Sequence, residues 1–136
     1  MRLYTAEEMS RADRQAQDLG IPGGVLMERA GAEMSRVALE AFAPRRALVV
    51  AGGGNNGGDG FVIARELHLA GVEVAVLPTK DEYEGDPGTN FEVLRNLGVS
   101  FAGMVGVRQE DLFISITHSE LSAVAVCVVR GMQPTP

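Results

Sequence analysis

The chain has 136 residues, a length that suits a single domain over 1–136. Its hydrophobic content of 46% is ordinary for a packed core, but only 5% of residues are aromatic, so aliphatic side chains must fill most of that core. The net charge of -6 would repel a phosphate backbone and argues against a nucleic-acid partner. No stretch is apolar enough to span a bilayer and no signal-peptide pattern begins the chain, so we expect a cytoplasmic protein without a membrane partner.

Two helices are expected before the first strand. Residues 5–8 (TAEE) fit a capping box, in which hydroxyl and carboxylate satisfy each other's backbone N–H groups, and Gly20 ends the helix that follows. A second helix is predicted from Val25 to Phe42. Gly31 lies inside it at a cost of about 1 kcal/mol relative to Ala, so we expect another backbone to pack closely there.

The next elements are a strand, a glycine-rich loop, a helix and a second strand. Residues 47–51 (ALVVA) form a continuous apolar run, which is typical of a strand covered on both faces in a parallel sheet. We expect a loop over residues 52–60 and a short helix over 61–70, which Gly71 ends. Residues 72–77 predict a second buried strand.

A polar, turn-rich segment follows at residues 79–90. Within it, Asp86 and Pro87 suit the N-cap and the first position of a helix that reaches Leu97. Residues 99–102 are then expected to form a third strand, so that helices and strands alternate over this part of the chain.

The order of these elements predicts an α/β fold: a three-layer αβα sandwich with a mostly parallel sheet of three to five strands, right-handed crossovers and two N-terminal helices. Residues 112–116 and 123–129 predict two more strands with no helix between them. A doubly wound sheet would contain further strand–helix units at this point. Either the fold is small or a part of it is missing.

The segment GGGNNGGDG at residues 52–60 carries the clearest chemical signal. Six glycines in nine residues give a backbone that can adopt positive φ and approach a ligand without Cβ interference. After a sheet strand, the N–H groups of such a loop converge with a helix N-terminus on an anion, so we expect a phosphate-bearing small molecule here. A ligand-free tight turn is the alternative, but a turn needs one or two glycines.

The same segment leaves other uses open. A G-x-G-x-x-G pattern beginning at Gly52 formally satisfies the dinucleotide fingerprint, and a generic NAD- or SAM-binding protein is therefore a rival, although only Asp81 offers the acid expected after the next strand. The amide oxygens of Asn55 and Asn56 also suit a hard cation. The Asp59 carboxylate would repel a phosphate unless it faces a ribose or an amide.

The sequence resembles the NAD(P)H-hydrate epimerases, the family of the YjeF-type N-terminal domain. The resemblance is carried by GGGNNGGDG after an aliphatic strand, by Pro22 and residues 26–31 (LMERAG), and by residues 61–65 (FVIAR). It is strong over residues 1–102 and weak over 103–136. It implies a Rossmann-like αβα domain that interconverts the two epimers of hydrated NADH and NADPH, damaged cofactors with a hydroxyl added at C6 of the nicotinamide ring.

The resemblance also implies site residues. Asn56 matches the position whose side chain helps to bind a potassium ion, the implied cofactor. The substrate-binding stretch matches Asn55, Asn56, Gly57, Gly58 and Asp59. No catalytic residue is assigned, because the family's D-A-x-x-G-[TF]-G and D-[IV]-P-S-G segments, which hold the remaining cation ligands and the carboxylates that act on the substrate, do not occur in this sequence.

Residues 109–117 resemble a later strand of the family more weakly, as though an internal block after about Val105 had been lost. The resulting hypothesis is an NAD(P)H-hydrate epimerase with an intact binding stretch and an impaired catalytic half. The alternative is a non-catalytic nucleotide-binding or scaffold protein built on the same domain, as in the RNA-decapping scaffold family. Loss of the block would expose a sheet edge, so a homodimer is expected.

Overall fold

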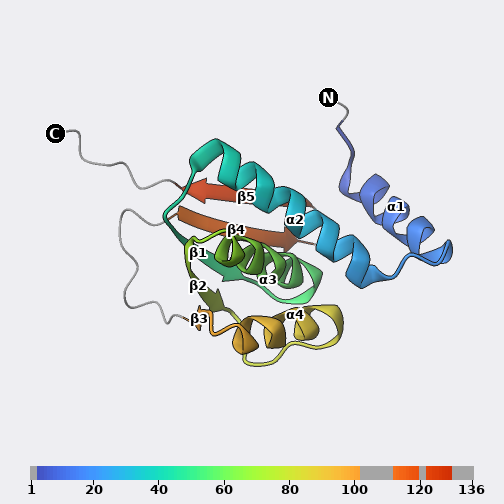
Figure 1. Ribbon diagram of the computed structural model, residues 1–136. Coiled ribbons are helices and arrows are strands. Elements are labelled where there is room, and N and C mark those ends of the chain that lie inside the picture. The colour runs from blue at the N-terminus through green and yellow to red at the C-terminus, as the bar shows by residue number, and fades with distance from the viewer. Residues whose placement is uncertain (1–2, 102–111, 120–121, 130–136) are drawn as a thin grey trace.

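The computed structural model describes residues 3–101, 112–119 and 122–129, and side chains over 3–55 and 57–101. Figure 1 shows the elements in chain order. They are α1 (Ala6–Asp18), α2 (Gly23–Phe42), β1 (Arg46–Ala51), α3 (Gly54–Leu69), β2 (Glu73–Pro78), α4 (Gly85–Asn96), β3 (Ser100–Phe101), β4 (Leu112–Ser119) and β5 (Ser122–Val129). In these ranges no helix combines the length and the apolar composition that crossing a membrane requires.

The strands form a five-stranded sheet in the order β3-β2-β1-β4-β5. β1 lies at its centre and pairs in parallel with β2, where Arg46 is opposite Glu73, and with β4, where Ala47 is opposite Leu112. β2 also pairs in parallel with β3, whereas β5 is antiparallel to β4. The predicted α/β class, the mostly parallel sheet and the absence of a helix between the last two strands are confirmed.

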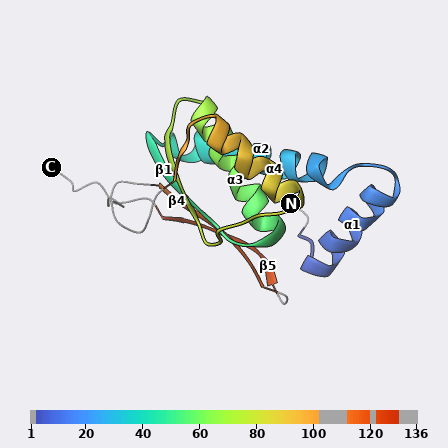
Figure 2. The same cartoon turned by 90° about the horizontal axis from the view of Figure 1, so that it is seen from below.

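The helices α2, α3 and α4 lie side by side on one face of the sheet (Figure 2). α3 is the middle helix and contacts α2, α4 and the strands β1, β2 and β4. Because β1, β2 and β3 follow one another in the same direction across the sheet, right-handed crossovers place α3 and α4 on the same face. Within the described ranges, the second helical layer of the predicted sandwich has no counterpart.

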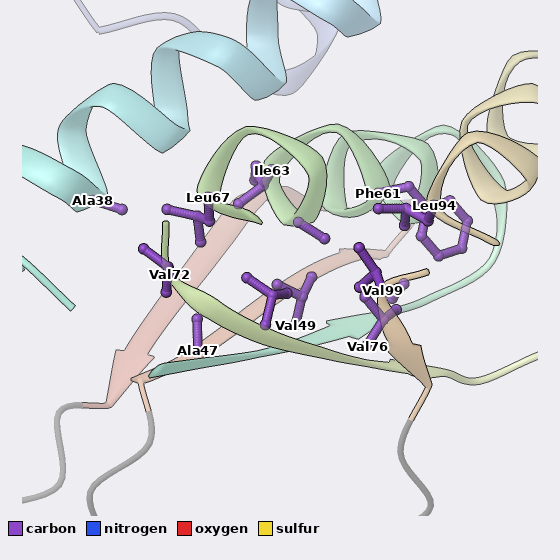
Figure 3. Packing of buried hydrophobic residues seen from close by; sticks show 13 residues of the cluster. Ala38, Ala47, Val49, Phe61, Ile63, Leu67, Val72, Val76, Leu94 and Val99 are labelled. Atoms are coloured by element: carbon purple, nitrogen blue, oxygen red, sulfur yellow. The ribbon is translucent and has the colours of Figure 1, made fainter. Parts of the chain in front are cut away.

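The hydrophobic core fills the space between α3 and the sheet (Figure 3). Alternate residues of β1 (Ala47, Val49 and Ala51) face the helix, because successive side chains of a strand point to opposite faces. From α3, Phe61 and Leu67 are fully buried against them. Burial of one such side chain contributes about 1.5–3 kcal/mol, so α3 and β1 together supply much of the stability.

Both ends of α1 are as predicted. The Thr5 N–H donates to Glu8 Oε2 at 2.7 Å, and the Glu8 N–H donates to Thr5 Oγ1 at 3.2 Å, which completes the capping box. Gly20, with φ of +97°, follows the last turn. In α2, a Cβ on Gly31 would lie 3.3 Å from the carbonyl oxygen of Asp59 and would overlap the side chain of Val62, so the predicted close approach is confirmed.

Three helix starts differ from the prediction, and α2 begins at Gly23, two residues before the predicted Val25. α3 begins at Gly54, so the predicted loop over 52–60 is wrong beyond Gly53. The tertiary contacts of this segment, described below, hold it in helical form despite the low helix propensity of glycine. The N-cap of α4 is Glu84 rather than Asp86, because the Glu84 carbonyl already accepts from the N–H of Gly88 at 3.2 Å. The predicted third strand is shorter, and its last residue, 102, lies outside the described part.

Candidate nucleotide-binding site

The candidate site lies where β1 passes into α3. Only Gly52 and Gly53 separate the end of the strand at Ala51 from the start of the helix at Gly54. Gly54 has φ of +70°, which glycine adopts at little cost, and Gly53 is an N-cap without a side-chain hydrogen bond. The first N–H groups of a 16-residue helix therefore face outwards with the positive end of its dipole, an arrangement that favours an anion.

The five residues of the predicted binding stretch lie in the first two turns of α3. Asn55 is exposed, Gly57 and Gly58 are buried, and Asp59 is half-buried, whereas the side chain of Asn56 lies outside the described part. The predicted reason for the glycines needs correction. Of the six glycines at 52–60, only Gly54 has a positive φ, so most of them do not serve left-handed backbone.

The glycines serve close packing instead. A Cβ on Gly57 would overlap the carbonyl oxygen of Gly52 and lie 3.3 Å from Cε1 of Tyr83. A Cβ on Gly58 would lie 2.5 Å from the Sδ of Met27 in α2. Real Cβ atoms do not approach backbone this closely, so position 57 excludes any side chain, whereas a side chain at position 58 would require the flexible end of Met27 to move. The start of α3 is thereby pressed against the turn that precedes it and against α2.

Asp59 is the titratable group of this stretch. Burial raises the pKa of its carboxyl to about 6, and the carboxylate of Asp13 in α1 adds to the effect. Loss of hydration disfavours the charged form of a carboxyl, and a neighbouring negative charge acts in the same direction. A carboxyl of this pKa exchanges its proton near neutral pH, the property that general acid–base chemistry uses.

The segment between β2 and α4 covers the same end of β1. The carbonyl oxygen of Ala51 accepts from the N–H and Oγ1 of Thr79, both at 3.0 Å, and from the hydroxyl of Tyr83 at 3.1 Å. The Tyr83 hydroxyl in turn accepts from the N–H of Lys80 at 3.3 Å, and its ring packs edge-on against Phe61 with centroids 4.7 Å apart. Lys80 is held over the β1–α3 turn as a result.

The sequence predicted residues 79–90 as polar turns leading into a helix, and it did not assign Thr79, Lys80 or Tyr83 to the site. A signal existed: Lys80 is the single lysine of the sequence, and Tyr83 stands among carboxylates. Asp81, the acid that a generic dinucleotide-binding protein would use, is exposed between β2 and α4.

A polar network joins the three helices beside the site. Arg65 of α3 pairs with Glu28 of α2, and its guanidinium also donates to Asn90 Oδ1 of α4 at 3.4 Å. At the start of α2, the Asp86 carboxylate lies 3.1 Å from the positions that a Cβ on Gly23 or Gly24 would occupy. α2 has no side-chain N-cap of its own, so this carboxylate faces the positive end of its dipole.

Among the described residues, no group of three or more His, Cys, Asp or Glu side chains could hold a metal ion. The helix N-terminus next to Asn56 also carries partial positive charge, which disfavours a cation. Potassium binding through the amide oxygen of Asn56, whose side chain lies outside the described part, stays a prediction, and no chemical step is derived through it.

Comparison with known proteins identifies the family. The family model described as YjeF-related protein N-terminus matches residues 23–129. An NAD(P)H-hydrate epimerase of Limosilactobacillus reuteri is 51% identical over 79 residues, which cover 56% of this chain and 37% of that protein. A bifunctional NAD(P)H-hydrate repair enzyme Nnr of Thermanaerovibrio acidaminovorans is 48% identical over 84 residues, 61% of this chain and 16% of that protein.

A solved structure agrees with the sequence relatives. The crystal structure of a yeast protein is similar with a TM-score of 0.68 and 26% identity, over 74% of this chain and 46% of that one. The chain thus spans less than half the length of these proteins. The match covers both the GGGNNGGDG segment and the parallel sheet that presents it. On these grounds the chain belongs to the family of the YjeF-related protein N-terminus.

Proposed function

We propose that this chain binds hydrated NADH and NADPH at the start of α3 and belongs to the enzymes that interconvert their epimers. The observation that carries the proposal is the turn from β1 into α3, where the family segment presents helix N–H groups to an anion. The dinucleotide hydrates carry a pyrophosphate that such a helix start can bind. The relatives named NAD(P)H-hydrate epimerase supply the substrate class.

The binding stretch is proposed to be Asn55, Asn56, Gly57, Gly58 and Asp59. In this arrangement Gly57 and Gly58 let the helix start pack against the β1–α3 turn and α2, and Asp59 contacts the uncharged part of the nucleotide because its carboxylate would repel a phosphate. With a pKa near 6, the Asp59 carboxyl can exchange a proton at neutral pH. Asp59 is the titratable group of this stretch that could take part in the proton transfers of an epimerisation.

Turnover by this chain is proposed to be slow. Epimerisation needs a carboxylate held within hydrogen-bond reach of the reacting carbon's substituents, and the family segments that supply it are absent from the sequence. Loss of one positioned acid or base costs ~10²–10⁴ in rate. Loss of the groups that position the ring costs more. Potassium enters the proposal only as an ion that the Asn56 side chain helps to bind, and a homodimer stays a prediction.

The test combines binding and turnover. Hydrated NADPH should protect amides of residues 53–61 from hydrogen exchange, because the first N–H groups of α3 have no acceptor within the helix and can bind its phosphates. In an NMR epimerisation assay, the same chain should run at least ~10²-fold slower than the Limosilactobacillus reuteri epimerase, with and without potassium chloride. Absence of protection at every hydrate concentration would refute the binding proposal. A rate equal to that of the relative would refute the proposed impairment.

The absent catalytic segments favour a second function, a scaffold that retains the nucleotide site without chemistry. Intact NADPH discriminates between the two. A site derived from an epimerase should prefer the hydrated cofactor, because it is shaped around the ring that carries the extra hydroxyl. A scaffold that keeps only the phosphate-binding turn should bind intact and hydrated NADPH equally well.

A further inference from the structure

The side chain of Lys80 lies against the turn that opens α3. Its Nζ is 2.7 Å from the position that a Cβ on Gly53 would occupy, and its Cε is nearer still. Gly53 is the N-cap of α3, so the ammonium stands beside the outward-facing N–H groups of the helix start. Two sources of positive potential, one from the side chain and one from the helix dipole, thus meet at one point.

The backbone that carries this lysine is fixed in advance. Thr79 and Tyr83, on either side of it, both donate to the carbonyl oxygen of Ala51, and the Lys80 N–H donates to the Tyr83 hydroxyl. A Cβ on Gly88 would overlap the carbonyl oxygen of Tyr83, so the start of α4 also holds this tyrosine in place. A preorganised cation loses less conformational entropy on binding than a mobile one.

The ammonium has no competing partner in the described part of the chain. Asp81, Glu82 and Glu84 follow closely in the sequence, yet none of the ion pairs among residues 3–101 includes Lys80. Lys80 is also the single lysine in a chain with a net charge of -6. The side chain of the single lysine in this acidic protein thus lies at the helix start that favours an anion.

We propose that Lys80 binds the pyrophosphate of the dinucleotide hydrate at the start of α3. This inference rests on the proposed function and adds a specificity-determining residue from the β2–α4 segment to the glycine-rich stretch. A lysine binds phosphate as a point charge, and its flexible stem lets the ammonium move from Gly53 onto the phosphate oxygens.

Affinity measurements on three variants test the assignment. Lys80→Met should weaken binding of hydrated NADH and hydrated NADPH alike, by about tenfold, the loss expected for one hydrogen bond to a charged group. Lys80→Arg should keep most of the affinity. Arg36→Met is the matched control, because it also removes one positive charge, from an exposed face of α2 where Arg36 pairs with Glu33 and Glu40. It should bind like the parent.

Chemical modification gives a second, independent readout. Because the sequence has one lysine, acetylation by an amine-specific reagent marks Lys80, and mass spectrometry separates it from the N-terminal amine. Hydrated NADPH should slow this acetylation about tenfold, and adenosine, which lacks a phosphate, should not. A lysine with a purely structural role would react at the same rate with either compound.

The outcomes separate the two proposals. If the parent chain binds neither hydrate, the proposed function and this inference both fail. If the parent binds and Lys80→Met binds equally well, the assignment of Lys80 is wrong and the proposed function stands. A loss confined to hydrated NADPH would move the contact to the 2′-phosphate and overturn the pyrophosphate assignment.

Discussion

The two halves of α3 lie on one axis but contact their surroundings in different ways. The first half, residues 54–60, has four glycines and touches its neighbours through backbone atoms. The second half, residues 61–69, buries Phe61, Ile63 and Leu67 completely against the sheet. Each glycine in a helix costs about 0.5–1 kcal/mol relative to Ala. The second half therefore supplies the stability that keeps the first half helical and open to a ligand.

The largest effect is expected in the second half. Leu67→Ala removes a side chain with 0% exposure from the contact between α3 and β1, and the cavity should cost about 2–5 kcal/mol of unfolding free energy. Urea denaturation followed by circular dichroism measures it. If the folded variant still binds nucleotide, the second half of α3 serves stability and the first half serves binding. A loss of unfolding free energy below about 1 kcal/mol would contradict this.

A smaller effect on stability, with a larger one on binding, is expected in the first half. Gly57→Ala forces a Cβ onto the carbonyl oxygen of Gly52 and should cost about 1–3 kcal/mol and abolish the protection of amides 53–61. Gly60→Ala is the matched control, because its Cβ would lie 3.5 Å from Val49 Cγ1 in ordinary contact. The control should be as stable as the parent or more so. Equal behaviour of the two variants would refute the packing explanation.

Ionisation of Asp59 should lower the free energy of unfolding by about 1 kcal/mol. In the folded protein its pKa is about 6, above the ordinary value of 3.8, so this group favours folding below pH 3.8 and the contribution is lost as pH rises through 6. Asp59→Asn should therefore be more stable than the parent at pH 7 by about 1 kcal/mol, reduced from the full shift because the carboxyl keeps part of its water. The difference in stability between Asp59→Asn and the parent should vanish near pH 4.

Urea denaturation of both proteins between pH 4 and pH 7 tests this sign. Asp13→Asn, which removes the neighbouring carboxylate, should lower the pKa of Asp59 and shift the same curve by less. A stability difference between Asp59→Asn and the parent that is constant with pH would show that burial of Asp59 does not act through its charge.

The smallest effect on global unfolding free energy is expected for a change in α1, because this helix buries none of its residues. It can therefore be compared with both halves of α3. Thr5→Ala removes the capping box and should destabilise this helix by about 0.5–2 kcal/mol. Because the helix adds little to the core, hydrogen exchange should accelerate at the α1 amides alone. A matching drop in global unfolding free energy would mean that α1 contributes to the core.

Elements whose signals are local could be predicted from the sequence. The capping box at residues 5–8 and Gly20 determine the ends of α1 through contacts within four residues, and the apolar runs of β1 and β2 determine the buried strands. The start of α3 could not be predicted in this way. Its glycines disfavour a helix, and the atoms that hold them, such as Met27 Sδ, come from another helix.

The candidate site also has one part that could be predicted from local sequence and one part that could not. The motif indicated residues 55–59, because the family segment is continuous in the sequence. Thr79, Lys80 and Tyr83 were not found, since their role depends on a carbonyl oxygen at Ala51, about thirty residues earlier in the chain. A contact between residues that are about thirty positions apart can be predicted from sequence patterns only when both residues belong to recognisable motifs.

The carboxylate of Asp86 beside Gly23 and Gly24 has a consequence for how this protein can be altered. A Cβ at position 23 or 24 would lie 3.1 Å from the Asp86 carboxylate, a tight contact, so the three positions constrain one another across more than sixty residues. A library that randomises position 23 or 24 alone should retain fewer replacements than one that also varies position 86. Joint randomisation should recover acceptable combinations, in which a shorter side chain at 86 admits an alanine at 24. The beginnings of α2 and α4 are therefore best engineered together.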